Sequence, residues 1–532
     1  MRIQLSLIGL LLTTHLSAQR LVKEFFPGKD NCFINFMGNL KNGFVFSSYS
    51  LDKGIEPWIS DGTTEGTKMI KDIYPGTGSS LISSSVFTND SFVFFVAQES
   101  NRNGLWRTDG TAEGTIFLHK FEYILPEKHY NELCFHNGLL YFNSADNFRN
   151  RLWSTDGTVS GTKEVHVFND SGMYNKISLN SWNDQLYIFA SDREHGIELW
   201  TSDGTDAGTQ LLKDIYPGTM GSVMYQRSKM LPAGDLLFFS ARSSDVEGYE
   251  LFCTDGTSAG TRLFKDINKS PFFSSYPGLT TGTGDYLFFN TLNDSSFVWI
   301  TDGSLVNTKP LFKSNADGGI NNYIYSVFPY NNQYLMYYYN TNVGTELYLC
   351  DNQFDNIKLI KDINPELQNS YMKDKVFVHN NKAYVLAANS MLGVDIWTTD
   401  GTFNNTTVYQ EFIETVGSED IIQWNDRIFF IGSVDPNIGA ELYELDLNKN
   451  TGITSASADK INIYPNPGHP GSNLNIDVED GTVIRWYNTS GQMVYENRCY
   501  NSKTEVPSIT RGIYTIELKT NDMIQHIIIM VD

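Results

Sequence analysis

Nine aspartates recur along the chain at nearly constant spacing, and their type and repetition make them the first residues to consider for chemistry. Carboxylates can ligate a cation or act in pairs on a glycosidic bond. Each of these turns supplies a single carboxylate, however, whereas a calcium loop alternates oxygen ligands, as in DxDxDG. An aspartate in an Asp-Gly turn more commonly accepts hydrogen bonds from its own backbone. We therefore predict a turn role for Asp61, Asp109, Asp156, Asp203, Asp255, Asp302, Asp351, Asp400 and Asp446.

A second acidic position precedes most of these turns. Its side chains could ring an axis and bind cations or sugars, but Gly104, Arg151 and Phe297 replace them in three copies. We favour cross-strand pairing with recurrent lysines, worth ~0.2–1 kcal/mol for each pair. The acidic residues are Glu56, Glu198, Glu250, Glu346, Asp395 and Glu441, and the lysines are Lys71, Lys213, Lys265 and Lys361.

No other pattern in the sequence indicates catalysis. His195 lies beside Glu194 in a predicted hairpin, but most copies have no counterpart, so we interpret it as a solvated loop residue. The sequence contains no HExxH, P-loop or paired Cys/His constellation. We predict no catalytic, cofactor-binding or metal-ligating residues and no cofactor.

The aspartates belong to a repeated motif, first seen as EPWISDGTTEGT from Glu56 to Thr67, with steps of 46 to 52 residues between copies. That period fits a four-stranded propeller blade of ~40–50 residues. Three residues before each aspartate stands an aromatic residue, directly after an apolar or proline residue. Adjacent strand residues point to opposite faces, so both faces of the sheet must be covered. The structural motif comprises Trp58, Asp61, Gly62, Trp106, Asp109, Gly110, Trp153, Asp156, Gly157, Trp200, Asp203, Gly204, Asp255, Gly256, Trp299, Asp302, Gly303, Trp397, Asp400 and Gly401.

Two glycine positions in the turn are replaced only by asparagine in the copies that keep the pattern. The first position, one residue after the aspartate, carries Asn352 in the seventh copy. The second, five residues after the aspartate, carries Asn307, Asn356 and Asn405. Because asparagine is the non-glycine residue that best adopts a positive φ, we predict a left-handed conformation at both positions.

Each unit also carries an upstream aromatic run and a strand after the motif, which gives about four strands per unit. LVKEFFPG, from Leu21 to Gly28, resembles the strand after the motif but has no motif before it, while the last unit lacks that strand. Pairing these ends would close a ring and remove open edges. We predict an all-β fold with a single propeller of about nine four-stranded units, with eight blades as the alternative.

The repeats resemble the ELWxxDGT repeat family of bacterial exported proteins, most clearly at Glu198-Leu199-Trp200 and Asp203-Gly204-Thr205. The resemblance covers residues from about Leu21 to Leu447. It implies a propeller-like β array and no established reaction.

The N-terminus indicates export. Residues 1–18 have an early arginine, an apolar stretch and small residues, which predicts a signal peptide cleaved between Ala18 and Gln19. No segment is long and apolar enough for a membrane helix. The net charge of −22 should repel phosphate backbones, so we expect no nucleic-acid partner. The five cysteines have no regular spacing, and most should be small buried residues.

A polar linker, residues 448–460, follows the propeller at residues 20–447 and precedes a domain at 461–532. Strand-like segments separated by turn residues suggest a small Ig-like β-sandwich there. This tail resembles the type A C-terminal sorting domain of the type IX secretion system of Bacteroidetes. The matching residues are Tyr464, Pro465, Asn466, Pro467, Gly491, Gly512 and Tyr514. The resemblance implies the type IX machinery as a partner, passage through the outer membrane, and attachment to the surface or release.

These observations predict an exported surface or released protein whose propeller is a non-catalytic binding or adhesion module for a surface glycan or protein. The alternative is a propeller hydrolase or lyase acting on polysaccharide, with carboxylates from several blades converging on the axis.

Overall fold

The structure is a computed structural model of the chain. It describes residues 19–26, 28, 31–100, 102–121, 133–146, 149–168, 177–224, 229–283, 285–292, 298–312, 323–340, 343–364, 370, 372–390, 393–412, 420–435, 437–447, 462–464, 474–477, 483–488, 493–498, 503–506, 512–519 and 524–531.

These residues form strands and turns without a helix, and the chain divides into two compact units, Met1–Leu447 and Asn448–Asp532. Within the part of the chain that the structure describes, no helical segment has the length and apolar character that a membrane crossing requires.

Nine four-stranded sheets account for the described strands of the first unit, and we number them as blades. Blade 1 contains β2 (Ile34–Leu40), β3 (Gly43–Ser50), β4 (Gly54–Ser60) and β5 (Lys68–Met69). Blade 2 contains β6 (Leu81–Thr88), β7 (Val93–Glu99), β8 (Arg102–Thr108) and β9 (Ile116–Lys120). Blade 3 contains β10 (Leu133–His136), β11 (Leu139–Asp146), β12 (Arg149–Thr155) and β13 (Lys163–Val167). Blade 4 contains β14 (Ser178–Trp182), β15 (Gln185–Asp192), β16 (Gly196–Ser202) and β17 (Gln210–Lys213).

The same antiparallel order continues in the second half of the ring. Blade 5 contains β18 (Leu231–Ala233), β19 (Leu236–Ala241), β20 (Glu250–Thr254) and β21 (Arg262–Lys265). Blade 6 contains β22 (Gly278–Gly282), β23 (Leu287–Asn290), β24 (Val298–Thr301) and β25 (Lys309–Phe312). Blade 7 contains β26 (Tyr323–Tyr330), β27 (Gln333–Asn340), β28 (Gly344–Cys350) and β29 (Ile357–Lys361). Blade 8 contains β30 (Met372–His379), β31 (Lys382–Ser390), β32 (Gly393–Thr399) and β33 (Thr407–Gln410). Blade 9 contains β34 (Asp420–Trp424), β35 (Arg427–Gly432), β36 (Glu441–Leu445) and β1 (Gln19–Lys23).

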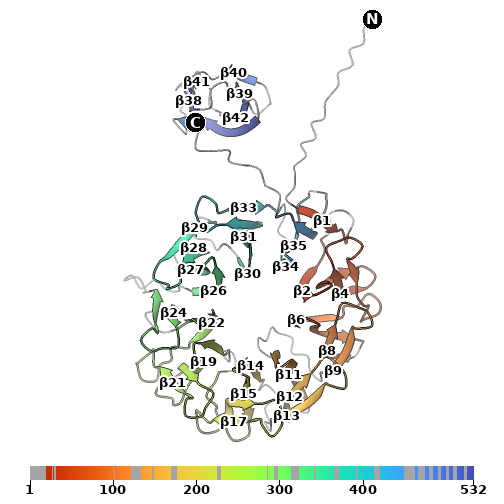
Figure 1. Ribbon diagram of the computed structural model, residues 1–532, viewed down its shortest axis with the longest axis vertical. Helices are drawn as coiled ribbons and strands as arrows, with labels where there is room; N and C mark the ends of the chain where they lie inside the picture. The colour runs from red at the N-terminus through yellow and green to blue at the C-terminus, as the bar shows by residue number, and fades with distance from the viewer. Residues whose placement is uncertain are drawn as a thin grey trace. The chain divides into compact units, whose positions relative to one another are not determined.

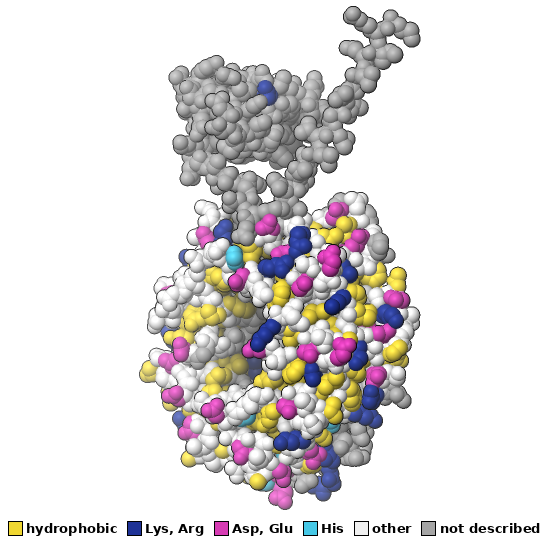
Figure 2. Space-filling model, turned by 45° about the vertical axis from the view of Figure 1, so that its right-hand side comes forward, with side chains coloured by type: hydrophobic (Ala, Val, Ile, Leu, Met, Phe, Trp, Pro, Cys, Tyr) yellow, Lys and Arg dark blue, Asp and Glu magenta, His cyan; other side chains and the backbone are white. Residues whose placement is uncertain are grey.

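The blades form a closed ring, with the first strand of each blade innermost (Figure 1). The predicted nine-bladed propeller is therefore confirmed, and the eight-bladed alternative is wrong. Figure 2 shows acidic, basic and hydrophobic side chains interspersed over the face in view.

Apolar side chains cover both faces of each blade and join it to its two neighbours. In β3, Phe44 and Phe46 pack with Phe429 of blade 9, whereas Val45 between them packs with Phe95 of blade 2. Equivalent buried clusters occupy all nine junctions of the described ring. Because successive side chains of a strand point to opposite faces of the sheet, neighbouring residues pack in two different interfaces between blades.

The ring closes where the first strand pairs with the last one. Leu21 of β1 lies opposite Tyr443 of β36 in an antiparallel ladder, as the matching ends of the sequence predicted. Val22 is 1% exposed and belongs to the cluster between blades 9 and 1. The outer strand of blade 9 therefore comes from the opposite end of the propeller sequence.

The ring has two distinct faces, because consecutive strands of the chain are neighbours within a blade. Because each blade is antiparallel throughout, its first and third turns lie at one end and its second turn at the other. We call the end with the Asp-Gly turns the motif face. The opposite end, which also holds the connections between blades, is the connector face.

The described parts of the second unit form two sheets, in keeping with the expected sandwich. One contains β37 (Asn462–Tyr464), β38 (Leu474–Asp477) and β41 (Lys503–Val506). The other contains β39 (Val483–Asn488), β40 (Met493–Arg498), β42 (Gly512–Lys519) and β43 (Ile524–Val531).

Replacing Val22 by Asp should open the ring, because an unpaired charge would enter the interface between its ends at a cost of roughly 3 kcal/mol or more. Hydrogen exchange should show loss of protection in Glu441–Leu445. Ile70→Asp, at the equivalent position of blade 1, is the matched control and should leave that segment protected. Full protection of Glu441–Leu445 in the Val22→Asp variant would contradict the closure.

Candidate functional site

The motif aspartates organise the turn that follows the third strand of a blade. In the fourth copy, Asp203 Oδ1 accepts hydrogen bonds from the Thr205 backbone N–H at 2.9 Å and its hydroxyl at 2.7 Å. The Thr205 hydroxyl bond is the main reason that the pKa of Asp203 falls below its usual value. The carboxylate is thereby engaged within its own turn, and the same bonds recur at Asp61, Asp109, Asp156, Asp255 and Asp400.

The glycine after the aspartate takes the predicted left-handed conformation in the copies that carry it. Its φ is +81° at Gly62 and +88° at Gly204. The turn also approaches the preceding blade, since a Cβ on Gly204 would lie 2.3 Å from the Tyr141 hydroxyl. The same expectation for Asn352 is wrong, because Phe354 takes the positive φ in that turn instead.

At the second glycine position, the prediction of a left-handed conformation is wrong. Gly208 has no positive φ, but a Cβ there would lie 2.0 Å from the Asp203 carboxylate. This close approach of the carboxylate therefore disfavours a Cβ at this position. Asparagine is accommodated because its amide donates to the carboxylate, as Asn307 does to Asp302 at 2.5 Å and Asn405 to Asp400 at 2.6 Å.

The motif aromatic side chains lie at the interface with the preceding blade. Trp200 packs in the cluster between blades 3 and 4, and Leu199 before it packs in the next cluster. Trp106, Trp200, Trp299 and Trp397 are buried, whereas Trp58 and Trp153 are half-buried. Both motif positions thus join blades together.

The recurrent acidic side chains hold the connections between blades. Glu198 is fully buried and accepts bonds from the Ile215 N–H at 3.0 Å, the Tyr216 N–H at 3.2 Å and the Ser222 hydroxyl at 2.7 Å. Burial raises its pKa to about 7, against the opposing effect of these donors. Glu56, Glu250 and Glu346 make equivalent bonds.

The same arrangement of hydrogen bonds around a buried glutamate occurs at the ring closure, with residues from both ends of the propeller sequence. Glu441 accepts bonds from the Phe25 and Phe26 N–H groups at 2.9 and 3.1 Å. The Cys32 thiol supplies the side-chain hydrogen bond that a serine supplies in blades 1, 4, 5 and 7. Burial raises the pKa of Glu441 to about 7.

The predicted pairing of these carboxylates with lysines is wrong, because the lysines reach into the next blade. Lys71 Nζ donates to the Thr115 carbonyl at 2.8 Å and lies 6.0 Å from the Trp106 ring centroid. Lys361 does the same with the Thr406 carbonyl and Trp397. The lysine therefore fastens the neighbouring motif turn.

The other residues singled out from the sequence have local roles. His195 Nδ1 lies 2.8 Å from Asp192 Oδ2 within one turn, and that contact raises the pKa of the imidazole. Cys32, Cys253 and Cys350 are buried and form no disulfide bond. The described residues contain no group of three or more His, Cys, Asp or Glu side chains placed to hold a metal.

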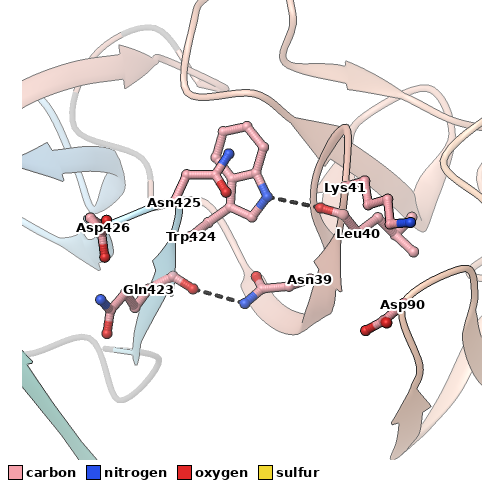
Figure 3. Close-up of a pocket in the computed structure, with 8 residues that line it drawn as sticks. All are labelled: Asn39, Leu40, Lys41, Asp90, Gln423, Trp424, Asn425 and Asp426. Carbon is pink, nitrogen blue, oxygen red and sulfur yellow. Dashed lines mark hydrogen bonds between the residues drawn. The ribbon is translucent and has the colours of Figure 1, made fainter.

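A pocket of about 510 Å³ lies where the first and last blades meet on the motif face (Figure 3). Two hydrogen bonds join the blades at its wall: Trp424 Nε1 donates to the Leu40 carbonyl and Asn39 Nδ2 to the Gln423 carbonyl, both at 2.8 Å. The lining residues are Asn39, Leu40 and Lys41 of blade 1, Asp90 of blade 2, and Gln423, Trp424, Asn425 and Asp426 of blade 9.

An exposed aromatic surface lies on the connector face around blade 5. Phe272 and Phe273 are 72% and 59% exposed, beside Val246, which is 52% exposed. The Phe272 N–H donates to the Val246 carbonyl at 2.8 Å, and its φ of +67° is strained for a bulky residue.

Stacked side chains support this surface. The Arg242 guanidinium lies 4.4 Å from the Tyr216 ring centroid and 5.1 Å from that of Tyr249, which stacks on Tyr276 at 5.7 Å. Arg242 also donates to Asp245 at 3.0 Å. We define the aromatic surface as Tyr216, Arg242, Val246, Tyr249, Phe272, Phe273 and Tyr276. The sequence signal for this surface is the pair of adjacent phenylalanines, Phe272 and Phe273, in a connection between blades, which lies outside the repeated motif.

The remaining predicted positions fall at the two ends of the chain. Gln19 is the first residue of β1, and Tyr464, Gly512 and Tyr514 lie in β37 and β42. Outside the described residues lie Ala18, Pro465, Asn466, Pro467 and Gly491. The cleavage position stays a prediction.

Comparison with known families identifies the tail. Residues 462–530 match the family described as "Secretion system C-terminal sorting domain". The predicted type IX sorting domain is thereby confirmed, and it directs export through the outer membrane to the cell surface or the extracellular space. No curated protein matches the chain. Membership of the ELWxxDGT repeat family stays a prediction.

Solved structures show only distant likeness. PorZ, an essential bacterial surface component of the type-IX secretion system of Porphyromonas gingivalis, is 13% identical, with 94% of this chain and 75% of that chain covered and a TM-score of 0.30. Puromycin hydrolase is 12% identical, with 76% and 58% covered and a TM-score of 0.34. Prolyl oligopeptidase B from Galerina marginata is 10% identical, with 75% and 54% covered and a TM-score of 0.38. The chain spans less than two thirds of the two latter proteins, and none of these likenesses supports an argument about activity.

Gly208→Ala should lower the free energy of unfolding by about 1–3 kcal/mol, because the added methyl group meets the Asp203 carboxylate. Gly208→Asn should cost less, since its amide can donate to that carboxylate. Thermal and denaturant unfolding of both variants compare the two. Equal losses would show that close approach is not the reason for glycine here.

Stability should fall as pH rises from about 4.5 to 7, because the raised pKa makes the folded state bind the Glu198 proton more tightly than the unfolded state. Glu198→Gln removes this titration. Relative to that of the wild type, the free energy of unfolding of this variant should increase by roughly 1–3 kcal/mol across that pH range. Denaturation at pH 4.5 and 8 measures the difference. Glu65→Gln, at an exposed position, should show no such trend, and a parallel response of both variants would refute the assignment.

Proposed function

We propose that the chain is an exported, non-catalytic binding module that uses its propeller loops to hold a ligand outside the cell. The sorting domain carries the chain through the outer membrane and implies contact with the type IX secretion machinery on the way. The propeller then provides a rigid ring on which loop side chains are displayed.

The exposed aromatic surface carries this proposal. Contiguous exposed apolar side chains mark interaction sites on soluble proteins, and tyrosine and arginine are enriched at interface hot spots. Here Phe272 is presented on a strained backbone, and Tyr216, Arg242 and Tyr249 are held in a stack on the same surface. A surface organised before binding loses little conformational entropy on binding.

The acidic side chains that recur in the repeat support binding rather than catalysis. Most glycosidases use two carboxylates about 5–10 Å apart that flank the scissile bond. Glu198 and its counterparts are buried and bound to backbone N–H groups, and Asp203 and its counterparts are bound within their own turns. These groups therefore serve the fold rather than a substrate.

The double variant Phe272→Ser/Phe273→Ser should be retained at least about fivefold less on cell envelopes prepared from a strain of the producing bacterium that lacks the gene. It removes two exposed apolar side chains of the aromatic surface. Quantitative immunoblotting after washing measures the retained mature protein. Phe403→Ser changes a phenylalanine that is 63% exposed on the motif face and should have no effect.

Retention of the double variant at the wild-type level would contradict the role of the aromatic surface. Release of new reducing ends or peptides from the envelopes by the wild type would contradict a non-catalytic function.

A further inference from the structure

The pocket between the first and last blades is a second place where the ring can hold a ligand, on the face opposite the aromatic surface. Its volume of about 510 Å³ falls within the range of small-molecule sites. Resting on the proposed function, we propose that this pocket binds a neutral saccharide.

The lining chemistry matches a polyhydroxylated ligand. Carboxamides of Gln423 and Asn425 can both donate and accept, and the carboxylates of Asp90 and Asp426 accept from hydroxyl groups. Trp424 adds an aromatic surface, and such rings pack against apolar C–H groups. Sugar hydroxyls, which donate and accept on one ring, complement this mixture.

The negative charge of the pocket and of the whole chain favours a neutral ligand over an anionic one. Two carboxylates and one lysine line the pocket, and the net charge of the chain is −22. Uronic acids, phosphates and sulfated sugars would therefore meet a repulsive field. A saccharide without ionised groups avoids that cost.

The pocket wall is fixed before a ligand arrives. Asn425 and Asp426 have φ values of 49° and 58°, the two-residue turn that matches the twist of a hairpin. The Trp424 indole is held by its bond to the Leu40 carbonyl and by an edge contact with Phe44 at 6.3 Å. Side chains held in this way lose little freedom on binding.

The position of the pocket couples binding to closure of the ring. Its walls come from blades 1 and 2, near the start of the propeller, and from blade 9 at its end. A ligand that touches both sides binds only the closed ring, so it should stabilise the ring against opening. Stabilisation by the ligand should therefore accompany binding.

The test titrates the full-length mature protein with neutral gluco-, manno-, galacto- and xylo-oligosaccharides of about two to four units. Isothermal titration gives Kd, and thermal unfolding gives the change in Tm. At least one saccharide should bind and raise Tm. The variant Asp90→Ala/Gln423→Ala should raise that Kd at least tenfold. It keeps the backbone carbonyl at position 423, which accepts the hydrogen bond from Asn39. Asp235→Ala, an exposed aspartate in the corresponding turn of blade 5, should leave Kd unchanged.

The assignment would be overturned by no binding of any neutral oligosaccharide, by tighter binding of oligogalacturonate, or by stabilisation by Ca²⁺ alone that the double variant abolishes. Unchanged affinity in the double variant would place the saccharide elsewhere and reject this pocket. The envelope-retention experiment with the Phe272→Ser/Phe273→Ser variant tests the proposed binding function independently of the pocket, because Phe272 and Phe273 lie on the other face.

Discussion

Burial of both sides of every sheet is the constraint on which the rest of this structure depends. A four-stranded sheet with apolar residues on two faces cannot leave either face in water without losing about 25 cal/mol for each Å² of apolar surface. Phe44 and Val45 in adjacent positions of β3 contact different blades, so each blade needs two neighbours. Only a closed ring gives every blade both, and the pairing of β1 with β36 completes it.

The polar groups follow from the same packing. Stacked sheets bury the backbone of the connections between them, and those N–H groups need acceptors. Glu198 provides acceptors for two of them, and Lys71 reaches forward to a carbonyl of the next motif turn. Residues that look suited to chemistry are therefore used to fasten blades. The two proposed ligand sites lie outside the repeat motif, at the aromatic surface and where the first and last blades meet.

Much of the fold could be predicted from the sequence because its signal is repeated. The spacing of the aspartates predicted the blades, and the unmatched strand near Leu21 predicted how the ring closes. Contacts between different copies were harder to infer, since one sequence does not show which neighbour a side chain reaches. Lys71 was thus assigned to its own blade, and Gly208 was explained by backbone conformation when the Asp203 carboxylate is the cause. The pocket was missed because its residues lie 384 positions apart at Asn39 and Gln423.

A disulfide between β1 and β36 tests the closed ring most directly. Arg20 and Glu444 lie directly opposite each other although 424 positions separate them in the sequence. In an antiparallel pair their Cβ atoms are about 4.5–5.5 Å apart. In the folded Arg20→Cys/Glu444→Cys variant, mild oxidation should link the two cysteines, and peptide mass spectrometry should identify the bond. Recovery of both thiols free from folded, monomeric protein would contradict a ring joined at its ends.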